Sequence, residues 1–586
     1  MVQALAEDMT LVVALAAAAA STAALAGTIP VIVGESTTIA EVQQGATLNA
    51  NDSVGVIANL DSEQYFVAGG LAASGNTAGG ATISTVVQSN TVKALVGNHA
   101  NLSSKGIGSG IAVPNREGKR RGIIIHADAK ERIIMASISA GAAGTAAVNG
   151  VINTLVVENT IIASVGENAE LTAAGTEDYT GDDDEDYHSG DITIEAEDET
   201  MIIDLAGALS AAGTVGAGAT VVTLVFGKNV EASVGADSIL TANGNVNVTA
   251  NTVDDLYLLA LAFGASGTVG VAGNVNVLVF QNHASAILGG TVTAGKDVNV
   301  KANTDSFLVN AALSAAGSGT VAGTAVAVVT YFYNETIAYV RANAVVTAEG
   351  NIQVTATSKE FVTSDGAGMS ASGSVAVGGT ADVVITKVVT KAYTEDNVTL
   401  KGNNINIEAI DDYDLIAVAA TIAGSGTVGA GITVLTSVAY NTVVAQIGTN
   451  NHVTAKNNLT VKAESDRNVQ IYTGTIGAGG TVGIAGTVAV VVIGSKLNDE
   501  AHNGIYVSNE GHSSIDPQKQ TDEAFNSAHS SAAGYKPEES MDDLLASDGS
   551  SANDATVEGN EYGQDTEGTE SARRCPWRFD VPAPAG

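Results

Sequence analysis

The sequence predicts an all-β fold, a parallel β-helix (β-solenoid) of about nine units of about 54 residues, followed by a disordered acidic tail. Two landmarks recur along the chain at a constant distance from each other. Between them, short runs of Val, Ile, Leu and Thr alternate with Gly, Asn and Ala. Hydrophobic residues make up 45% of the chain but aromatic ones only 4%, so we expect a core of small and β-branched side chains.

The first landmark is the small residue that opens a turn similar to Gly-Thr-Val-Gly. It occurs at Ser21, Gly75, Gly144, Gly213, Gly267, Gly319, Gly373, Gly426 and Gly480, in steps of 54, 69, 69, 54, 52, 54, 53 and 54 residues. The second is an alanine 19 residues later, at Ala40, Ala94, Ala163, Ala232, Ala286, Ala338, Ala392 and Ala445. Low complexity alone does not keep two landmarks at one offset through eight units, so the period is structural.

Each unit predicts several short strands of four to eight residues, because β-formers alternate with turn residues. In one unit and the start of the next, the predicted strands are residues 245–250, 256–263, 274–280 and 298–302. Strands of this length would give two or three coils per unit, and nine units would form a rod of about 100 Å. Asparagines at similar places, Asn245, Asn299, Asn351 and Asn404, are expected to form ladders along the stack. Only the Ala-rich residues 14–26 leave a helix open as an alternative.

Two of the units contain 69 residues instead of 54, and the additions lie near residues 104–121, which are basic, and 174–191, which are acidic. Insertions of this kind form loops that project from a solenoid, often on its binding face. We assign residues 1–498 to the repeat region, including its start, where Glu7 and Asp8 disfavour a signal peptide. Residues 499–586 form the acidic tail, which is predicted to be disordered.

The net charge of −38 disfavours nucleic acid and anionic membranes as partners, since an acidic surface repels phosphate. Gly, Thr and Asn interrupt the apolar runs well before the roughly 20 residues of a membrane span, so no membrane insertion is expected. The single cysteine, Cys575, allows no internal disulfide.

No local motif predicts a catalytic, cofactor-binding or metal site, and no cofactor is expected. The eight histidines are scattered, and the glycine-rich strings recur in every unit as turns do. The acidic run 182–186 carries oxygen ligands that suit calcium, and whether it binds calcium stays open. The acid pairs Asp254 with Asp255 and Asp411 with Asp412, like Asp305, precede apolar strands at corresponding places, which indicates turn features of the repeat.

Residues 267–303, GTVGVAGNVNVLVFQNHASAILGGTVTAGKDVNVKAN, typify the units. Their pattern resembles the repeat regions of filamentous-haemagglutinin-like adhesins, most closely leukotoxin-type filamentous adhesins, over residues 10–495. The resemblance implies a right-handed parallel β-helix, export with an outer-membrane secretion partner, and display at the bacterial cell surface or release. It also implies that this chain is an internal piece of a longer protein.

The sequence therefore predicts a structural and interaction segment of a secreted or surface-displayed bacterial adhesin, and not an enzyme. Its expected partner is a protein or glycan of the host-cell surface or matrix. Two alternatives stay open: a polysaccharide-acting β-helix enzyme, and a toxin passenger similar to leukotoxin.

Overall fold

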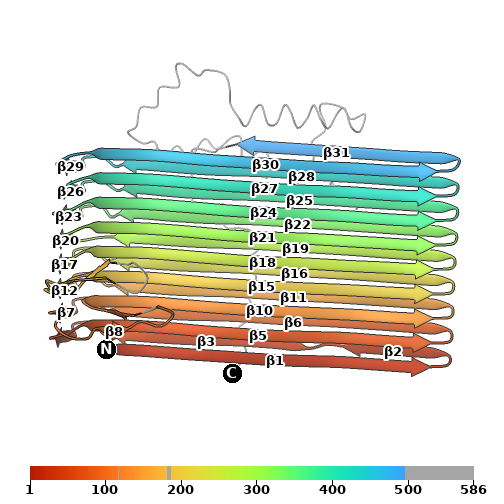
Figure 1. Cartoon of the computed structure of the whole chain (residues 1–586), viewed down its shortest axis with the longest axis horizontal. Coiled ribbons are helices and arrows are strands. Elements are labelled where there is room, and N and C mark those ends of the chain that lie inside the picture. The colour runs from red at the N-terminus through yellow and green to blue at the C-terminus, as the bar shows by residue number, and fades with distance from the viewer. Residues whose placement is uncertain (117, 181–185, 495–586) are drawn as a thin grey trace, which may run out of the picture. The chain divides into compact units, whose positions relative to one another are not determined.

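The computed structural model describes all residues except 117, 181–185 and 495–586, so the predicted disordered tail lies outside the described residues apart from its first four positions' neighbours before 495. The described chain is all-β and is wound into nine stacked coils of parallel strands (Figure 1). The predicted fold class is therefore confirmed. Among the described residues, no helix has the length and apolar character needed to cross a membrane.

Each coil consists of a long strand in sheet A, a tight turn, a long strand in sheet B, and a short strand in sheet C. Sheet A contains β1 (Val2–Ala20), β5 (Val54–Ser74), β10 (Ile123–Ala143), β15 (Ile192–Ala212), β18 (Val246–Ser266), β21 (Val298–Ser318), β24 (Ile352–Ser372), β27 (Ile405–Ser425) and β30 (Leu459–Gly479). Sheet B contains β2 (Ala23–Thr28), β3 (Val31–Val42), β6 (Thr77–Val96), β11 (Ala146–Val165), β16 (Val215–Val234), β19 (Val269–Leu288), β22 (Val321–Val340), β25 (Val375–Thr394), β28 (Val428–Ile447) and β31 (Val482–Gly494). Sheet C contains β4 (Thr47–Ala50), β7 (Asn101–Ser104), β12 (Glu170–Ala173), β17 (Ile239–Ala242), β20 (Thr291–Ala294), β23 (Val345–Ala348), β26 (Thr399–Gly402) and β29 (His452–Ala455).

The repeat period corresponds to one coil, so the prediction of two or three coils per unit is wrong. The strands of sheet A are 19 to 21 residues long, far longer than predicted. At about 3.3 Å per residue they extend for about 70 Å, whereas nine coils about 4.8 Å apart stack to only about 40 Å. The predicted rod of about 100 Å is therefore also wrong. The Ala-rich residues 14–26 belong to β1 and β2 and the turn between them, and not to a helix.

Both landmarks of the repeat have a structural role. The first marks the turn between sheets A and B, where Gly267 N donates to Ala212 O of the preceding coil at 3.2 Å. The second is an inward-facing column of sheet B, in which Ala94, Ala163 and Ala232 are fully buried. A shared landmark in each coil therefore keeps neighbouring coils in one register.

An asparagine ladder runs along the turn between sheets C and A. Asn351 Oδ1 accepts from Asn404 Nδ2 at 2.8 Å, and Asp297 N donates to Asn245 Oδ1 at 3.1 Å. Asn299 belongs to a different ladder, in which its Nδ2 donates to Asn247 Oδ1 at 2.9 Å. The predicted ladders are thus confirmed, with Asp297 and not Asn299 in the first of them.

The apolar core is divided along each coil. Near sheet C, three sheets enclose residues such as Val246, Val248 and Leu288, whereas further along only sheets A and B face each other across Leu256 and Phe280. Phe226, Phe280 and Phe332 stack through three coils with ring centroids 5.2 and 4.7 Å apart. Between these two apolar regions, the inward-facing residues are polar in most coils.

Candidate functional site

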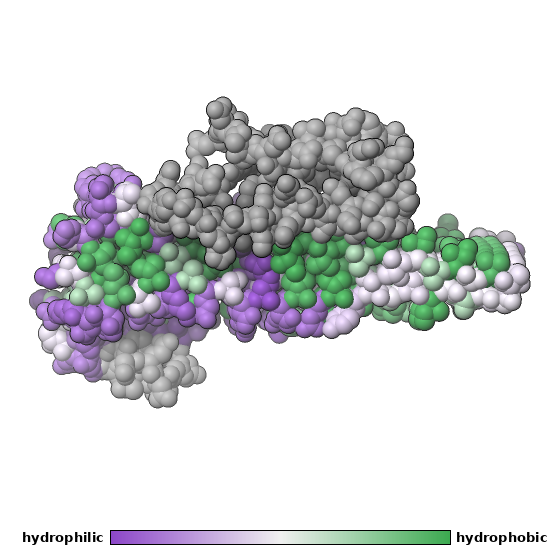
Figure 2. All heavy atoms as spheres, turned by 90° about the horizontal axis from the view of Figure 1, so that it is seen from above, coloured by the Kyte–Doolittle hydropathy of each residue, from purple (hydrophilic) through white to green (hydrophobic). Residues whose placement is uncertain are grey.

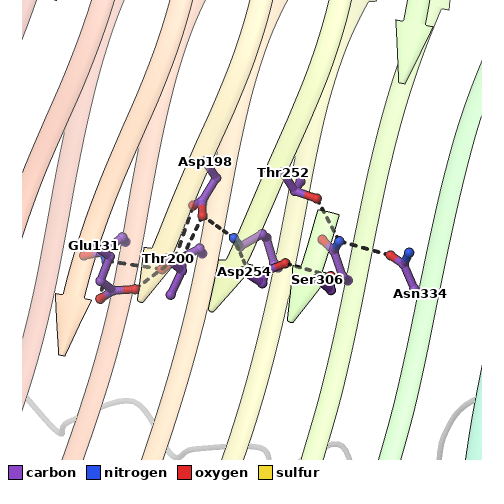
Figure 3. Close-up of polar contacts among 11 residues, drawn as sticks. Glu131, Asp198, Thr200, Thr252, Asp254, Ser306 and Asn334 are labelled. Carbon is purple, nitrogen blue, oxygen red and sulfur yellow. Dashed lines mark hydrogen bonds and ion pairs between the residues drawn. The ribbon is translucent and has the colours of Figure 1, made fainter. Parts of the chain in front are cut away.

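A buried polar strip runs across the coils between the two apolar regions (Figure 3). It arises because inward positions of sheet A carry Thr, Ser, Asp or Glu where the facing column of sheet B carries Asn or Lys. Its members are Asn90, Glu131, Asn159, Asp198, Thr200, Lys228, Thr252, Asp254, Asn282, Ser306, Asn334, Ser358, Glu360, Asp411 and Asn441.

Lys228 lies at the centre of the strip between two carboxylates. Its Nζ is 2.6 Å from Asp254 Oδ1 and also contacts Asp198, and all three side chains are completely buried. Burial alone would lower the pKa of Lys228, but the two carboxylates raise it above the usual value. Burial raises the pKa of Asp254 to about 6 despite the lysine. A buried charge of either sign is costly unless it is paired, so each member depends on the others.

Asparagines connect the remaining acids of the strip to one another. Asn159 Nδ2 donates to Glu131 Oε2 at 3.0 Å, and Asn334 Nδ2 donates to Glu360 Oε1 at 2.5 Å. Burial raises the pKa of Glu131 to about 7 and that of Glu360 to about 8. Both acids therefore retain a proton at neutral or slightly alkaline pH, as expected for carboxyl groups that share a dry interior with amides.

The acid pairs singled out in the sequence do not form turns, so that prediction is wrong. Neighbouring residues of a strand point to opposite faces, and Asp254 is buried in the strip while Asp255 lies on the outer face of β18. Asp411 aligns with Thr252 and not with Asp254, since Ser358 and Thr304 connect the two positions. Asp254 and Asp411 are 0% and 1% exposed, which leaves no access for a polysaccharide.

The basic insertion folds over the outer face of sheet A. Its strands β8 (Ile111–Ala112) and β9 (Lys119–Arg120) form an antiparallel hairpin, and Val113 packs on Ile57 and Ile124 beneath it. Polar residues of the same insertion reach the sheet beside this apolar contact. The insertion is thus a packed cover and not a free loop.

We call the polar contact under this insertion the covered cluster; it consists of Asn115, Arg116, His126, Asp128, Glu195 and Glu197. The Arg116 guanidinium lies 2.7 Å from Glu195 Oε1 and 2.5 Å from Glu197 Oε1. Asn115 Nδ2 donates to Asp128 Oδ2 at 2.5 Å. These contacts attach the insertion to coils 3 and 4.

His126 is 1% exposed, and its Nδ1 lies 3.3 Å from Glu195 Oε2 although neither ring nitrogen makes a well-aligned hydrogen bond. Burial would lower the pKa of His126, but the neighbouring acids, Glu195 first, raise it. Burial would raise the pKa of Glu195, yet His126 and Arg116 lower it to about 2. The two side chains therefore form an ion pair.

Ligand atoms of His126, Asp128 and Glu197 lie within 4.8 Å of one another, as in a three-ligand site for a borderline cation such as Zn²⁺. Asn115 and Arg116 already bind the two carboxylates, so the contacts present hold the insertion in place. The sequence analysis missed this cluster. The step of 69 residues, which pairs His126 with Glu195 and Asp128 with Glu197 on one sheet face, was the available signal.

Replacing Arg116 with alanine should release the basic insertion from sheet A. Loss of its charge-assisted hydrogen bonds removes about 1.5–3 kcal/mol of local stability, so trypsin cleavage at Lys119–Arg121 should accelerate by roughly tenfold or more. Arg132→Ala is the matched control, because Arg132 is exposed on the same strand outside the cluster. Equal cleavage rates in the two variants would show that the cluster does not hold the insertion.

The acidic insertion lies beside the basic one. Its described part includes the antiparallel strands β13 (Asp178–Thr180) and β14 (Asp186–His188), and Lys296 forms an ion pair with Asp178. A Cβ added at Gly106 would lie 2.4 Å from Ser189 O, so the two insertions meet, and Gly106 has a φ of 64° there. Residues 181–185, which hold most of the proposed calcium ligands, lie outside the described residues.

The opposite end of the coils is almost free of charge on its outer faces. Figure 2 shows hydrophobic and neutral colours there and hydrophilic colours at the end of the insertions. We call it the uncharged end; it comprises residues 13–33, 67–87, 136–156, 205–225, 259–279, 311–331, 365–385, 418–438 and 472–492. Asp365 and Asp382 are its only two charged residues.

Together, the stacked coils and the adjoining insertions define a parallel β-solenoid with an ionic end and an uncharged end. No family model, no curated protein and no solved structure matches this chain. Its function therefore has to be inferred from the surfaces described above.

Proposed function

We propose that this chain is a structural and interaction segment of a secreted or surface-displayed bacterial adhesin. The observation that carries the proposal is the meeting of two insertions of opposite charge at one corner of an otherwise regular solenoid. Insertions that project from one side of a repeat array commonly form its binding surface. The regular coils then hold this corner in a constant position and orientation.

The proposed partner is a protein or glycan of the host-cell surface or matrix, and the location is extracellular. The resemblance to filamentous adhesins supports both proposals, as well as an outer-membrane partner for secretion. The net charge of −38 favours a partner other than nucleic acid. A polysaccharide-acting enzyme is the less favoured alternative, because Asp254 and Asp411 are sealed inside the coils.

The test is binding of the full chain to cultured host cells, immobilised matrix proteins and a glycan array. We expect Lys119→Glu, which reverses an exposed charge of the basic insertion, to weaken binding by roughly tenfold or more. Lys359→Glu is the matched control, because that side chain is 63% exposed on a distant coil. It should leave binding unchanged.

A second variant removes the acidic insertion. Residues 174–191 are replaced by Gly-Lys-Asp, the join at residues 295–297 of a regular unit, which shortens the chain by the 15 residues of the insertion. Retained binding in both variants would refute the role of the corner. Failure to bind any of the three surfaces would refute the adhesin proposal, whereas lysis of the cells or depolymerisation of a glycan would favour the toxin or enzyme alternative.

A further inference from the structure

Two neighbouring columns on the outer face of sheet A alternate large and small residues in coils 1–4. The first column reads Leu15, Gly69, Ile138 and Gly207, and the second, two residues further along each strand, reads Ala17, Leu71, Ala140 and Leu209. The four large side chains are 71%, 58%, 51% and 43% exposed, in the order Leu15, Leu71, Ile138, Leu209. We call these eight residues the knob face.

The large residue changes column from each coil to the next. Every protruding side chain therefore lies beside a glycine or alanine of the other column, so that protrusions and depressions form a zigzag. Successive coils are about 4.8 Å apart and alternate residues about 6.6 Å apart, so the depressions have about the size of one aliphatic side chain. An apolar groove of about 600 Å³ runs along the second column and is lined by Ala19, Leu71, Ala73, Leu209 and Phe263 among others.

Such a surface is complementary to itself. When a second copy faces it with a displacement of one coil, the protruding side chains of each copy enter the depressions of the other. Face-to-face sheets pack through interdigitated side chains in the same way, at about 10 Å. Single-sided recognition by a smooth partner would leave the depressions empty, which packing disfavours.

Charge and area also fit a second copy. A chain of net charge −38 repels its own copies, but on the outer face of sheet A the uncharged end carries a single acid, Asp365. Four outward columns through nine coils cover roughly 1,000 Å². This exceeds the roughly 800 Å² per partner of a standard stable interface, and also the few hundred Å² of apolar patch that a monomer usually exposes.

A lipid bilayer is a poorer occupant. β1 is the outermost strand of sheet A, and its outer backbone groups would enter the hydrocarbon without partners if the uncharged end were inserted. Each such group costs several kcal/mol in lipid. Pairing through the knob face leaves this edge in water, where its backbone groups are hydrated.

We propose that two copies of this chain associate face to face through the knob face. The inference is independent of the proposed adhesin function, because it concerns the opposite end of the coils from the insertions. The association adds avidity to any weak site that each copy presents.

The test is sedimentation velocity of the full chain over a wide concentration range. Ile138→Lys should weaken association by at least about tenfold, because it places an unpaired charge in the contact. Gly207→Leu fills a depression and should do the same. A Cβ at Gly207 lies 3.9 Å from Ile138 Cγ1, so the strand accommodates it and the fold, checked by circular dichroism, is retained.

Val148→Lys is the matched control, because Val148 is 55% exposed on the outer face of sheet B in the same coil as Ile138. It should leave association unchanged. A monomeric wild type at all concentrations, or an equal effect of Val148→Lys, would overturn the proposal. Flotation of a monomeric chain with phosphatidylcholine vesicles would overturn it as well and would identify lipid as the occupant.

Discussion

Replacing Lys228 with methionine is expected to lower the free energy of unfolding by about 3–5 kcal/mol. The substitution leaves the completely buried Asp198 and Asp254 side by side without their cation. Methionine has a similar volume, so the loss reflects the uncompensated carboxylates more than a cavity. Denaturant unfolding followed by circular dichroism measures the effect.

Lys130→Met is the matched control. Lys130 also pairs with an acid, Glu199, at 3.0 Å, but the two side chains are 49% and 57% exposed. Such surface pairs contribute about 0–1 kcal/mol. Adding Asp198→Asn and Asp254→Asn to Lys228→Met should restore much of the lost stability, because the buried charges are then gone. A loss below about 1 kcal/mol in Lys228→Met would contradict the charged description of the strip.

The second large effect is a fall in stability as the pH rises from about 4.5 to 8. Burial raises the pKa of Glu131 and Asp204 to about 7, of Asp254 to about 6, and of Glu360 and Asp382 to about 8. In this window the folded chain binds more protons than the unfolded chain, whose carboxyl groups ionise near pH 4. The free energy of unfolding therefore decreases with increasing pH, by on the order of 5 kcal/mol in total.

Glu195 acts in the opposite sense but in a lower window. Its pKa is lowered to about 2, so the stability that it contributes is lost only as the pH falls from about 4.5 through 2. The maximum of stability should consequently lie in the mildly acidic range. The net charge reinforces this trend, because self-repulsion of the acidic chain also decreases on acidification.

Asp382→Asn provides the decisive comparison for the pH dependence. Asp382 is completely buried and accepts from Ser364 Oγ at 2.7 Å, so an amide should retain the contact while removing the ionisable group. The variant should show a shallower decrease above pH 6. Asp412→Asn changes an exposed acid and should leave the slope as in the wild type. Stability that increases from pH 5 to 8 in the wild type would contradict protonated buried acids.

The sequence by itself determined the solenoid, its period and the places of its two insertions. In a parallel stack each residue lies beside its equivalent in the next coil, so the landmarks Gly267 and Gly319 had to recur at the coil period. The insertions interrupt that period and are therefore visible without a structure. The resemblance to adhesins, by contrast, has no counterpart among known structures or families.

Only the tertiary structure decided the length of the strands and the location of the polar residues. Residues 251–255, Asn-Thr-Val-Asp-Asp, have the composition of a turn, yet they continue β18 through the interior. They do so because Asn282 Nδ2 donates to Thr252 Oγ1 at 3.0 Å and Lys228 pairs with Asp254. These partners come from sheet B, 26 to 30 residues away, and local sequence does not report them. A polar run stays in a strand only where the facing sheet satisfies it, and that depends on how the coils close.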